Sequence, residues 1–226
     1  MKIIFWGTPE YAVKSLENLI SSHHEILAVI TQPDRKRGRG NKLVPSPIKE
    51  ISIKNNIPVL CPEKLKENKS FKKKLKEFNC DVFIVVAYGK ILSKEILDIP
   101  KYGAWNAHAS LLPKWRGAAP IQRAIMNLDE EIGLSFMKIN EELDTGPICN
   151  IYKINIKNNL NAMEISDKLS YMAAEKIIDN VDDIFDNRAN FVEQNHSKAT
   201  YAPKIEKSEG QINWKDNAKN IIGKIN

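Results

Sequence analysis

Three polar residues in the middle of the chain could together form one reactive site. Asn106 and His108 are two positions apart in the run 105–109, which has the character of a β-strand. Alternate side chains of a strand share a face, so these two should project together from Cα atoms roughly 6.5 Å apart. Asp144 follows in the sequence Leu-Asp-Thr-Gly-Pro, which cannot continue a helix and indicates a loop. An amide, an imidazole and a carboxylate could therefore converge.

The chemistry that suits these three groups is oxyanion binding combined with proton transfer. The carboxamide of Asn106 can donate to a developing oxyanion, and the imidazole of His108 can move a proton near neutral pH. Asp144 would favour the charged imidazole and could accept a proton, directly or through water. No metal is needed for such a reaction.

Each residue also has a plainer interpretation. A histidine on a strand is more often an interior residue with satisfied hydrogen bonds than a catalyst. Asp-Thr-Gly suits a turn in which Asp144 bonds to nearby backbone. The same three residues surround the catalytic carboxylates of aspartic proteases, where two carboxylates share a proton. This chain has one copy and an α/β pattern, so a protease would require a homodimer and is disfavoured.

The elements that must position these residues alternate between strands and helices. Apolar runs predict strands at 2–6, 25–31, 57–60 and 81–87, and helices at 8–20, 47–55 and 64–78 lie between them. Thr8 is expected to cap the first helix. The alternation predicts an α/β fold with a doubly wound, Rossmann-like and mostly parallel sheet. Ligands of such sheets bind beyond the carboxyl ends of the strands.

The second half of the chain continues with a different pattern. A helix is predicted at 118–128, and strands at 134–139 and 148–156 flank the loop that carries Asp144. Asn161 and Glu164 have the spacing of a capping box at the start of a helix over 161–185. The segment 197–210 is predicted to be a linker, and a last helix begins near 216.

Several functional classes are disfavoured by the sequence. The first strand–helix turn, 7–12, has one glycine where a dinucleotide fingerprint needs three. The three cysteines form no Cys-x-x-Cys pair, which predicts reduced thiols in a cytoplasmic protein without a disulfide framework or zinc ribbon. No apolar run reaches membrane-spanning length, and no signal peptide is evident. His23 and His24 are predicted to end a helix, and no catalytic role is expected for them.

A basic segment follows the second predicted strand. Residues 32–42 carry five positive charges and one negative charge, within a chain whose formal charge is +6. One interpretation is a solvated surface loop. The other is a flexible arm that follows a phosphate backbone, because glycines alternate with arginines. The cationic residues concerned are Arg35, Lys36, Arg37, Arg39 and Lys42.

These motifs resemble the methionyl-tRNA formyltransferase family. The resemblance rests mainly on Asn-Ala-His-Ala-Ser-Leu-Leu-Pro-Lys-Trp-Arg-Gly-Ala-Ala-Pro-Ile-Gln at 106–122 and Leu-Asp-Thr-Gly at 143–146. Further family-like sequences occur at 5–9, 31–35, 38–40, 45–47, 85–89 and 200–205, so that the resemblance covers nearly the whole chain.

The resemblance implies a formyltransferase fold and transfer of the formyl group of 10-formyltetrahydrofolate to the α-amine of methionyl initiator tRNA. It assigns catalysis to Asn106, His108 and Asp144, and tRNA contacts to the five cationic residues above, with Arg39 and Lys42 foremost. It also implies a tetrahydrofolate site that involves Ser110, Leu111, Leu112, Pro113, Tyr88 and Gly89. The enzyme is expected to act in the cytoplasm, without a metal or a membrane, as a monomer.

Family members continue into a β-barrel domain that helps to bind tRNA. We expect residues 1–190 to form the catalytic domain, and 191–226 to form a linker and the start of a C-terminal region whose barrel is missing. Two other functions stay open: formyl transfer to another amine, such as glycinamide ribonucleotide or an amino-sugar nucleotide, and RNA binding without catalysis.

Overall fold

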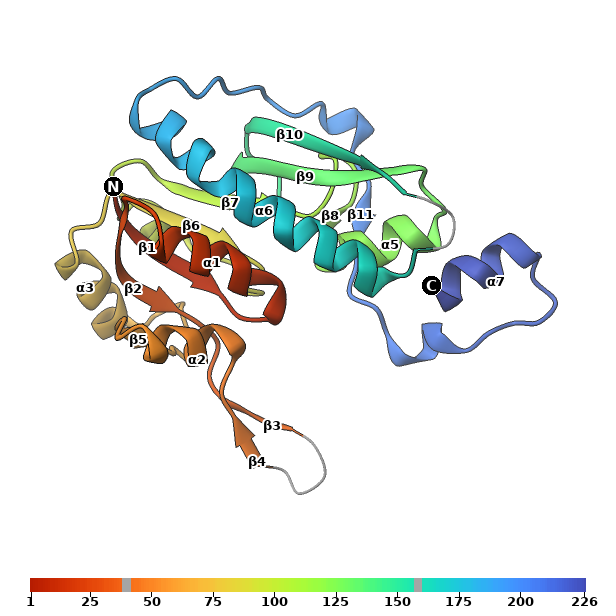
Figure 1. Cartoon of the computed structure of the whole chain (residues 1–226), viewed down its shortest axis with the longest axis horizontal. Helices are drawn as coiled ribbons and strands as arrows, with labels where there is room; N and C mark the ends of the chain where they lie inside the picture. The colour runs from red at the N-terminus through yellow and green to blue at the C-terminus, as the bar shows by residue number, and fades with distance from the viewer. Residues whose placement is uncertain (38–41, 157–159) are drawn as a thin grey trace.

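A mostly parallel sheet lies at the centre of the protein. The computed structural model describes residues 1–37, 42–156 and 160–226, and the order of its seven-stranded sheet is β10-β9-β7-β6-β1-β2-β5 (Figure 1). Neighbouring strands are parallel except at β9, which is antiparallel to both β7 and β10. The strands are β1 (Lys2–Gly7), β2 (Glu25–Ile30), β5 (Val59–Leu60), β6 (Val82–Val86), β7 (Ala104–His108), β9 (Glu131–Lys138) and β10 (Ile148–Asn155).

Helices cover both faces of this sheet, as the continuous apolar runs of β1 and β6 require. Side chains of β1 alternate between the two apolar layers: Ile3 and Phe5 pack against one set of helices, whereas Ile4 and Trp6 pack against the other. The first layer holds α1 (Val13–Ile20), α2 (Pro47–Lys54) and α6 (Ala162–Phe185), and the second holds α3 (Lys69–Glu77) and α4 (Lys94–Leu97). Figure 1 shows α1 and α6 side by side on one face. The predicted α/β fold class is therefore confirmed.

The remaining elements lie around the sheet. Helix α5 (Pro120–Met126) packs with α6 around a smaller apolar cluster, and α7 (Ala218–Ile225) contacts α5. The short strands β8 (Arg116–Gly117) and β11 (Tyr201–Ala202) pair in parallel, so a segment near the C-terminus is hydrogen-bonded to the segment that follows β7. Three 3-10 turns complete the described elements: η1 (Glu10–Ala12), η2 (His196–Lys198) and η3 (Lys207–Gly210).

Two predicted helix starts were wrong. Thr8 does not cap a helix, because its Oγ1 donates to the carbonyl of Tyr88 at 3.2 Å, and α1 begins only at Val13 after η1. The helix predicted from residue 64 begins at Lys69, since Glu67 has a positive φ of 64° and Asn68 supplies the cap.

Other local predictions also need correction. The basic segment 32–42 is not simply a loop, because Arg35–Arg37 (β3) and Lys42–Val44 (β4) form an antiparallel hairpin. His23 and His24 do not end a helix, since α1 stops at Ile20. The segment 197–210 is not a structureless linker, because it contains η2, β11 and η3.

One predicted helix start is confirmed in detail. The capping box at the start of α6 is present, with Asn161 Oδ1 accepting from the Glu164 backbone and Glu164 Oε2 accepting from the Asn161 backbone. Cys61, Cys80 and Cys149 are free thiols, and burial raises the pKa of Cys80 to about 12 and that of Cys149 to about 11. Over the described ranges, no helix has the length and apolar character that crossing a membrane would require.

Candidate active site

The carboxyl end of β7 opens into a cavity. Asn106 pairs with Val85 of β6 on one side and with Met137 of β9 on the other, and His108 pairs with Ser135. Asn106, His108 and Asp144 all line the same cavity, whose volume is about 860 Å³. The structure thus brings together the three residues that the strand periodicity and the loop sequence had predicted.

His108 is held between two oxygen acceptors. Its Nε2 lies 3.0 Å from the carbonyl oxygen of Trp115, and its Nδ1 lies 3.7 Å from Asp144 Oδ2. The ring is 6% exposed, so few water molecules can screen the carboxylate. Because a carbonyl oxygen can only accept, Nε2 donates to Trp115, and Nδ1 is the nitrogen that faces the carboxylate. The separation of 3.7 Å exceeds a hydrogen bond, which leaves Nδ1 available to an atom of a bound substrate.

Asp144 is fixed by the backbone around it. Its carboxylate Oδ2 accepts a hydrogen bond from the backbone N–H of Gly117 at 2.8 Å, and its own φ is positive at 51°. Gly146 lies so close to the preceding strand that a Cβ there would be 1.9 Å from the carbonyl oxygen of Lys138, so the turn has no room for a side chain at this position. The Asp-Thr-Gly sequence therefore serves both interpretations: it makes a tight turn, and that turn aims the carboxylate at His108.

Gln194 holds this loop in place, and Arg116 in turn holds Gln194; neither residue was assigned a role from the sequence. Gln194 Nε2 donates to the carbonyl oxygens of Asp144 at 2.9 Å and Gly146 at 2.7 Å. Gln194 Oε1 accepts from Arg116 Nε at 3.1 Å and from Arg116 Nη2 at 2.7 Å. Arg116 is 2% exposed, so its guanidinium depends on these contacts. No periodicity or motif in the sequence marks Gln194, because its partners lie about fifty or more positions earlier in the chain.

Tyr88 and Gly89 form another wall of the cavity. The carbonyl oxygen of Tyr88 accepts from Thr8 Oγ1 and, at 2.8 Å, from Gln32 Nε2. Gly89 has a φ of 79°, which favours glycine at this turn. Burial raises the pKa of the Tyr88 phenol, so the hydroxyl stays neutral at physiological pH.

The segment Ser110 to Pro113 supports the site from behind and is not among the residues that line the cavity. Ser110 Oγ donates to the carbonyl of Lys114 at 2.6 Å, and Ser135 Oγ links the two chain segments by bonding Ser110 O at 2.7 Å and Leu112 N at 3.0 Å. Leu112 packs with Met137 and Ile148. Leu111 is half-buried beside Gly133. The role of these four residues toward a folate stays a prediction.

The basic hairpin of β3 and β4 projects from the body of the protein (Figure 1). Arg35, at its base, shares a smaller cavity of about 340 Å³ with Tyr88 and Gly89. Lys36 and Lys42 are exposed on the hairpin, and Arg37 lies at the end of β3. Arg39, one of the predicted tRNA contacts, lies outside the described residues.

Comparison with known proteins defines the class of this protein. The family model described as "Formyl transferase" matches residues 1–181. The chain therefore belongs to the formyl transferase family, as the motifs had suggested.

Within that family, the curated relatives include methionyl-tRNA formyltransferases. The protein of that name from Pelagibacter ubique is 56% identical over 225 residues, which cover 100% of this chain and 73% of the relative. The one from a Sulfurihydrogenibium species is 48% identical and is covered to 72%.

Solved structures show the same fold at lower identity. A sugar 3N-formyl transferase, crystallised in the presence of dTDP and 5-N-formyl-THF, matches with a TM-score of 0.75 at 22% identity, over 100% of this chain and 78% of that one. Phosphoribosylglycinamide formyltransferase from Bacillus halodurans matches with a TM-score of 0.64 at 20% identity, over 77% of this chain and 90% of that one. At these identities the likeness concerns the fold alone.

Proposed function

We propose that this protein transfers a formyl group from 10-formyltetrahydrofolate to the α-amine of methionyl initiator tRNA. The observation that carries the proposal is the convergence of Asn106, His108 and Asp144 on one cavity, with His108 Nδ1 3.7 Å from the Asp144 carboxylate. Relatives named methionyl-tRNA formyltransferase, with identities of 56% and 48% over this chain, support the choice of acceptor.

The reaction proceeds by direct acyl transfer. The neutral amine of the methionyl group attacks the formyl carbon, and the carbonyl oxygen becomes an oxyanion. The Asn106 carboxamide and the Nδ1–H of His108 donate to that oxygen, because the Nε2 of His108 is already bonded to Trp115. Loss of one such donor typically lowers the rate on the order of a hundredfold or more.

Proton movement completes the reaction. The attacking amine loses a proton, the bond between the formyl carbon and the folate nitrogen breaks, and that nitrogen gains a proton. Asp144, held by Gly117, accepts the amine proton directly or through water and passes it to the folate nitrogen as the bond to the formyl carbon breaks. No covalent enzyme intermediate is formed, and no step needs a metal.

The donor binds in the cavity along Tyr88 and Gly89. Apolar side chains on the cavity wall, among them Ile91, Leu92 and Ile139, suit the ring system of a folate. Ser110, Leu111, Leu112 and Pro113 would support that site from behind the wall.

The acceptor approaches along the basic hairpin. Arg35 and Tyr88 share the smaller cavity, so a phosphate backbone that follows the hairpin would bring the tRNA end to the donor. Lys36, Arg37, Arg39 and Lys42 would contribute further phosphate contacts. An enzyme with this acceptor acts in the cytoplasm, and one chain holds all the residues of the proposed reaction, as a monomer requires.

The test combines donor binding with acceptor choice. A stable folate analogue is titrated into the protein, and formyl transfer is then measured with methionyl initiator tRNA, glycinamide ribonucleotide and an amino-sugar nucleotide. We expect folate binding and transfer to the tRNA. Preferred transfer to a small amine would assign another acceptor, and RNA binding without folate binding would assign a non-catalytic module.

Two variants test the catalytic roles in the same assay. His108→Ala and Asp144→Asn should each lower the turnover number strongly while folate binding persists. Rates close to the unaltered protein in both variants would overturn the assignment.

A further inference from the structure

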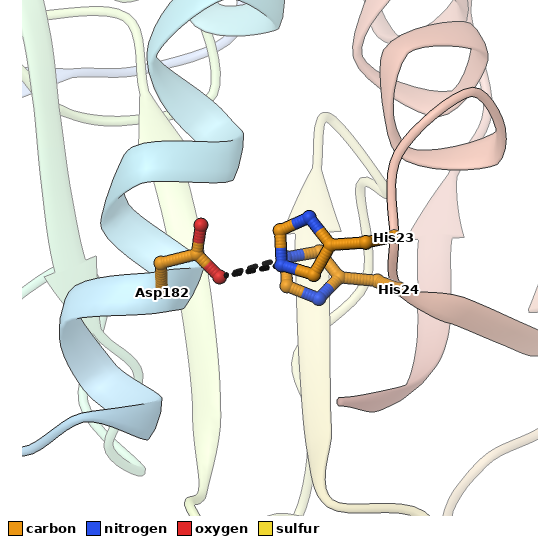
Figure 2. Close-up of side chains that lie close together, drawn as sticks. All are labelled: His23, His24 and Asp182. Atoms are coloured by element: carbon orange, nitrogen blue, oxygen red, sulfur yellow. Dashed lines mark hydrogen bonds and ion pairs between the residues drawn. The ribbon is translucent and has the colours of Figure 1, made fainter.

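A second cluster of reactive side chains lies at the amino ends of the parallel strands, whereas the cavity lies at their carboxyl ends. His23 and His24 precede β2 at its amino end, and Asp182 lies on α6. Figure 2 shows both imidazole rings pointing toward the Asp182 carboxylate. The reaction proposed above uses the carboxyl ends of β6 and β7, so it leaves this cluster unexplained.

The spacing of the three side chains matches that of metal ligands. His23 Nε2 lies 2.9 Å from Asp182 Oδ1, and His24 Nε2 lies 3.5 Å from the same oxygen. One ligand atom from each residue lies within 4.8 Å of the others. Metal–ligand bonds of about 2.1 Å place neighbouring ligand atoms roughly 3.0 Å apart in octahedral and roughly 3.4 Å apart in tetrahedral geometry. Small side-chain movements would therefore complete such a site.

His24 provides an independent reason to expect a ligand. Its side chain is 1% exposed, and its Nε2 is buried with no hydrogen-bond partner among the residues that the structure describes. The Asp182 oxygen at 3.5 Å does not complete a hydrogen bond with it. A buried nitrogen without a partner is uncommon, and this one points at a carboxylate and a second imidazole.

The charged groups that surround the His24 ring are the N-terminal amine, His23 and Asp182. Burial lowers the pKa of His24 to about 4, and the positive charges of the N-terminal amine and of His23 act in the same direction, whereas Asp182 opposes them. The other ring nitrogen, Nδ1, lies 3.2 Å from the Met1 amine nitrogen.

We propose that His23, His24 and Asp182 bind one divalent transition-metal ion of the Zn²⁺ type, with water in the remaining coordination positions. Two imidazoles and one carboxylate suit Zn²⁺, Co²⁺ and Ni²⁺ better than Mg²⁺ or Ca²⁺, which prefer oxygen ligands.

The ion has a structural role. It joins the turn before β2 to α6, in a region where Asn18 Nδ2 bonds the carbonyl of Ala174 at 2.8 Å and Ser170 Oγ bonds that of Tyr11 at 2.8 Å. His23 and Asp182 already link this turn to α6 by their contact of 2.9 Å, and the metal strengthens that link by adding His24 to it. It therefore stabilises the fold and does not enter the formyl-transfer reaction.

The test uses the full chain after treatment with a chelator and dialysis. Zn²⁺ is titrated by calorimetry, Co²⁺ binding is followed by its visible absorption, and the melting temperature is measured with and without Zn²⁺. His23→Gln and Asp182→Asn remove ligands that are not deeply buried, so both should fold. Asp183→Asn, next to the cluster on the same helix, is the matched control.

We expect one Zn²⁺ per chain and a rise in melting temperature in the unaltered protein and in Asp183→Asn. Affinity should fall at least about tenfold in His23→Gln and Asp182→Asn, and the rise should disappear. Equal Zn²⁺ affinity in all three variants, or no binding to the unaltered protein, would overturn the proposal. Formyl transfer should be unchanged in His23→Gln, which separates this result from any failure of the proposed function.

Discussion

Replacing Gln194 by alanine should slow catalysis without removing any group that touches a substrate. The side chain makes two hydrogen bonds to carbonyls of the Asp144 loop and accepts two from the buried guanidinium of Arg116. Bonds between neutral groups contribute about 1 kcal/mol each, and those to a charged group about 1.5–3 kcal/mol. These terms are not additive, and a loss of roughly 2–4 kcal/mol in the free energy of unfolding is expected.

The effect on the rate follows from geometry. Without Gln194, the carbonyls of Asp144 and Gly146 lose their hydrogen bonds, so the distance from the Asp144 carboxylate to His108 is less tightly fixed. A displacement near 1 Å can cost about a hundredfold, and we expect the turnover number to fall about tenfold to a hundredfold. The KM for the folate donor should change little, because the Tyr88–Gly89 wall has its own supports in Thr8 and Gln32.

Two further variants distinguish positioning from general destabilisation. Asn180→Ala removes a buried amide of similar size that bonds Tyr152, Lys176 and Asn150 on α6 and β10, so it should lower stability but preserve the rate. Gln194→Glu keeps an acceptor for Arg116 but cannot donate to the loop carbonyls, so its turnover should stay low. Initial-rate kinetics with chemical denaturation would refute the reasoning if Gln194→Ala lost stability yet kept its turnover number.

Three other predictions use the same structure. Gly146→Ala places a Cβ against the carbonyl of Lys138 and should nearly abolish formyl transfer, because the Asp144 turn must shift; a crystal structure or a transfer assay checks this. The double variant Arg35→Ala and Lys36→Ala should weaken tRNA binding and flatten its salt dependence by about two phosphate contacts, with folate affinity retained, as filter binding at several salt concentrations would show. In metal-free protein, His24 has a folded-state pKa of about 4 against 6.5 for the unfolded chain, so stability present above about pH 6.5 should be lost as the pH falls toward 4. His24→Asn should remove that part of the pH dependence in urea titrations, and an unchanged slope would contradict it.

The sheet could be predicted from the sequence because its strands are buried on both faces. Runs such as 82–86 are apolar throughout, and only a strand covered by helices on both sides uses such a run. Helix starts were predicted less well, since they depend on single backbone conformations. A positive φ at Glu67 delays α3, and a hydrogen bond from Thr8 to Tyr88 across the sheet prevents it from acting as a cap. Neither feature can be predicted from the spacing of apolar residues in the sequence.

The residues of the candidate site also differ in whether a sequence pattern could predict them. Asn106 and His108 could be paired from strand alternation, and Asp144 could be placed from its turn sequence. Gln194 could not be found, because a lone glutamine in a polar stretch has no pattern and its partners are distant in the chain. The basic hairpin was predicted as a loop because its glycines and arginines lack the alternation of a buried strand.

The support of the site extends beyond the part of the chain that the family model covers. That match ends at residue 181, whereas Gln194 braces the Asp144 loop, and the β8–β11 pair joins Gly117 to Ala202. Gly117 donates its N–H to the Asp144 carboxylate, so the backbone that aims the carboxylate is the same backbone that pairs with β11. A Cβ at Gly117 would lie 2.7 Å from the carbonyl of Ala202, so the close approach of the two strands requires glycine at this position. A displacement of residues 194–202 should therefore shift the Asp144 carboxylate relative to His108, through Gln194 and through the pairing of Ala202 with Gly117.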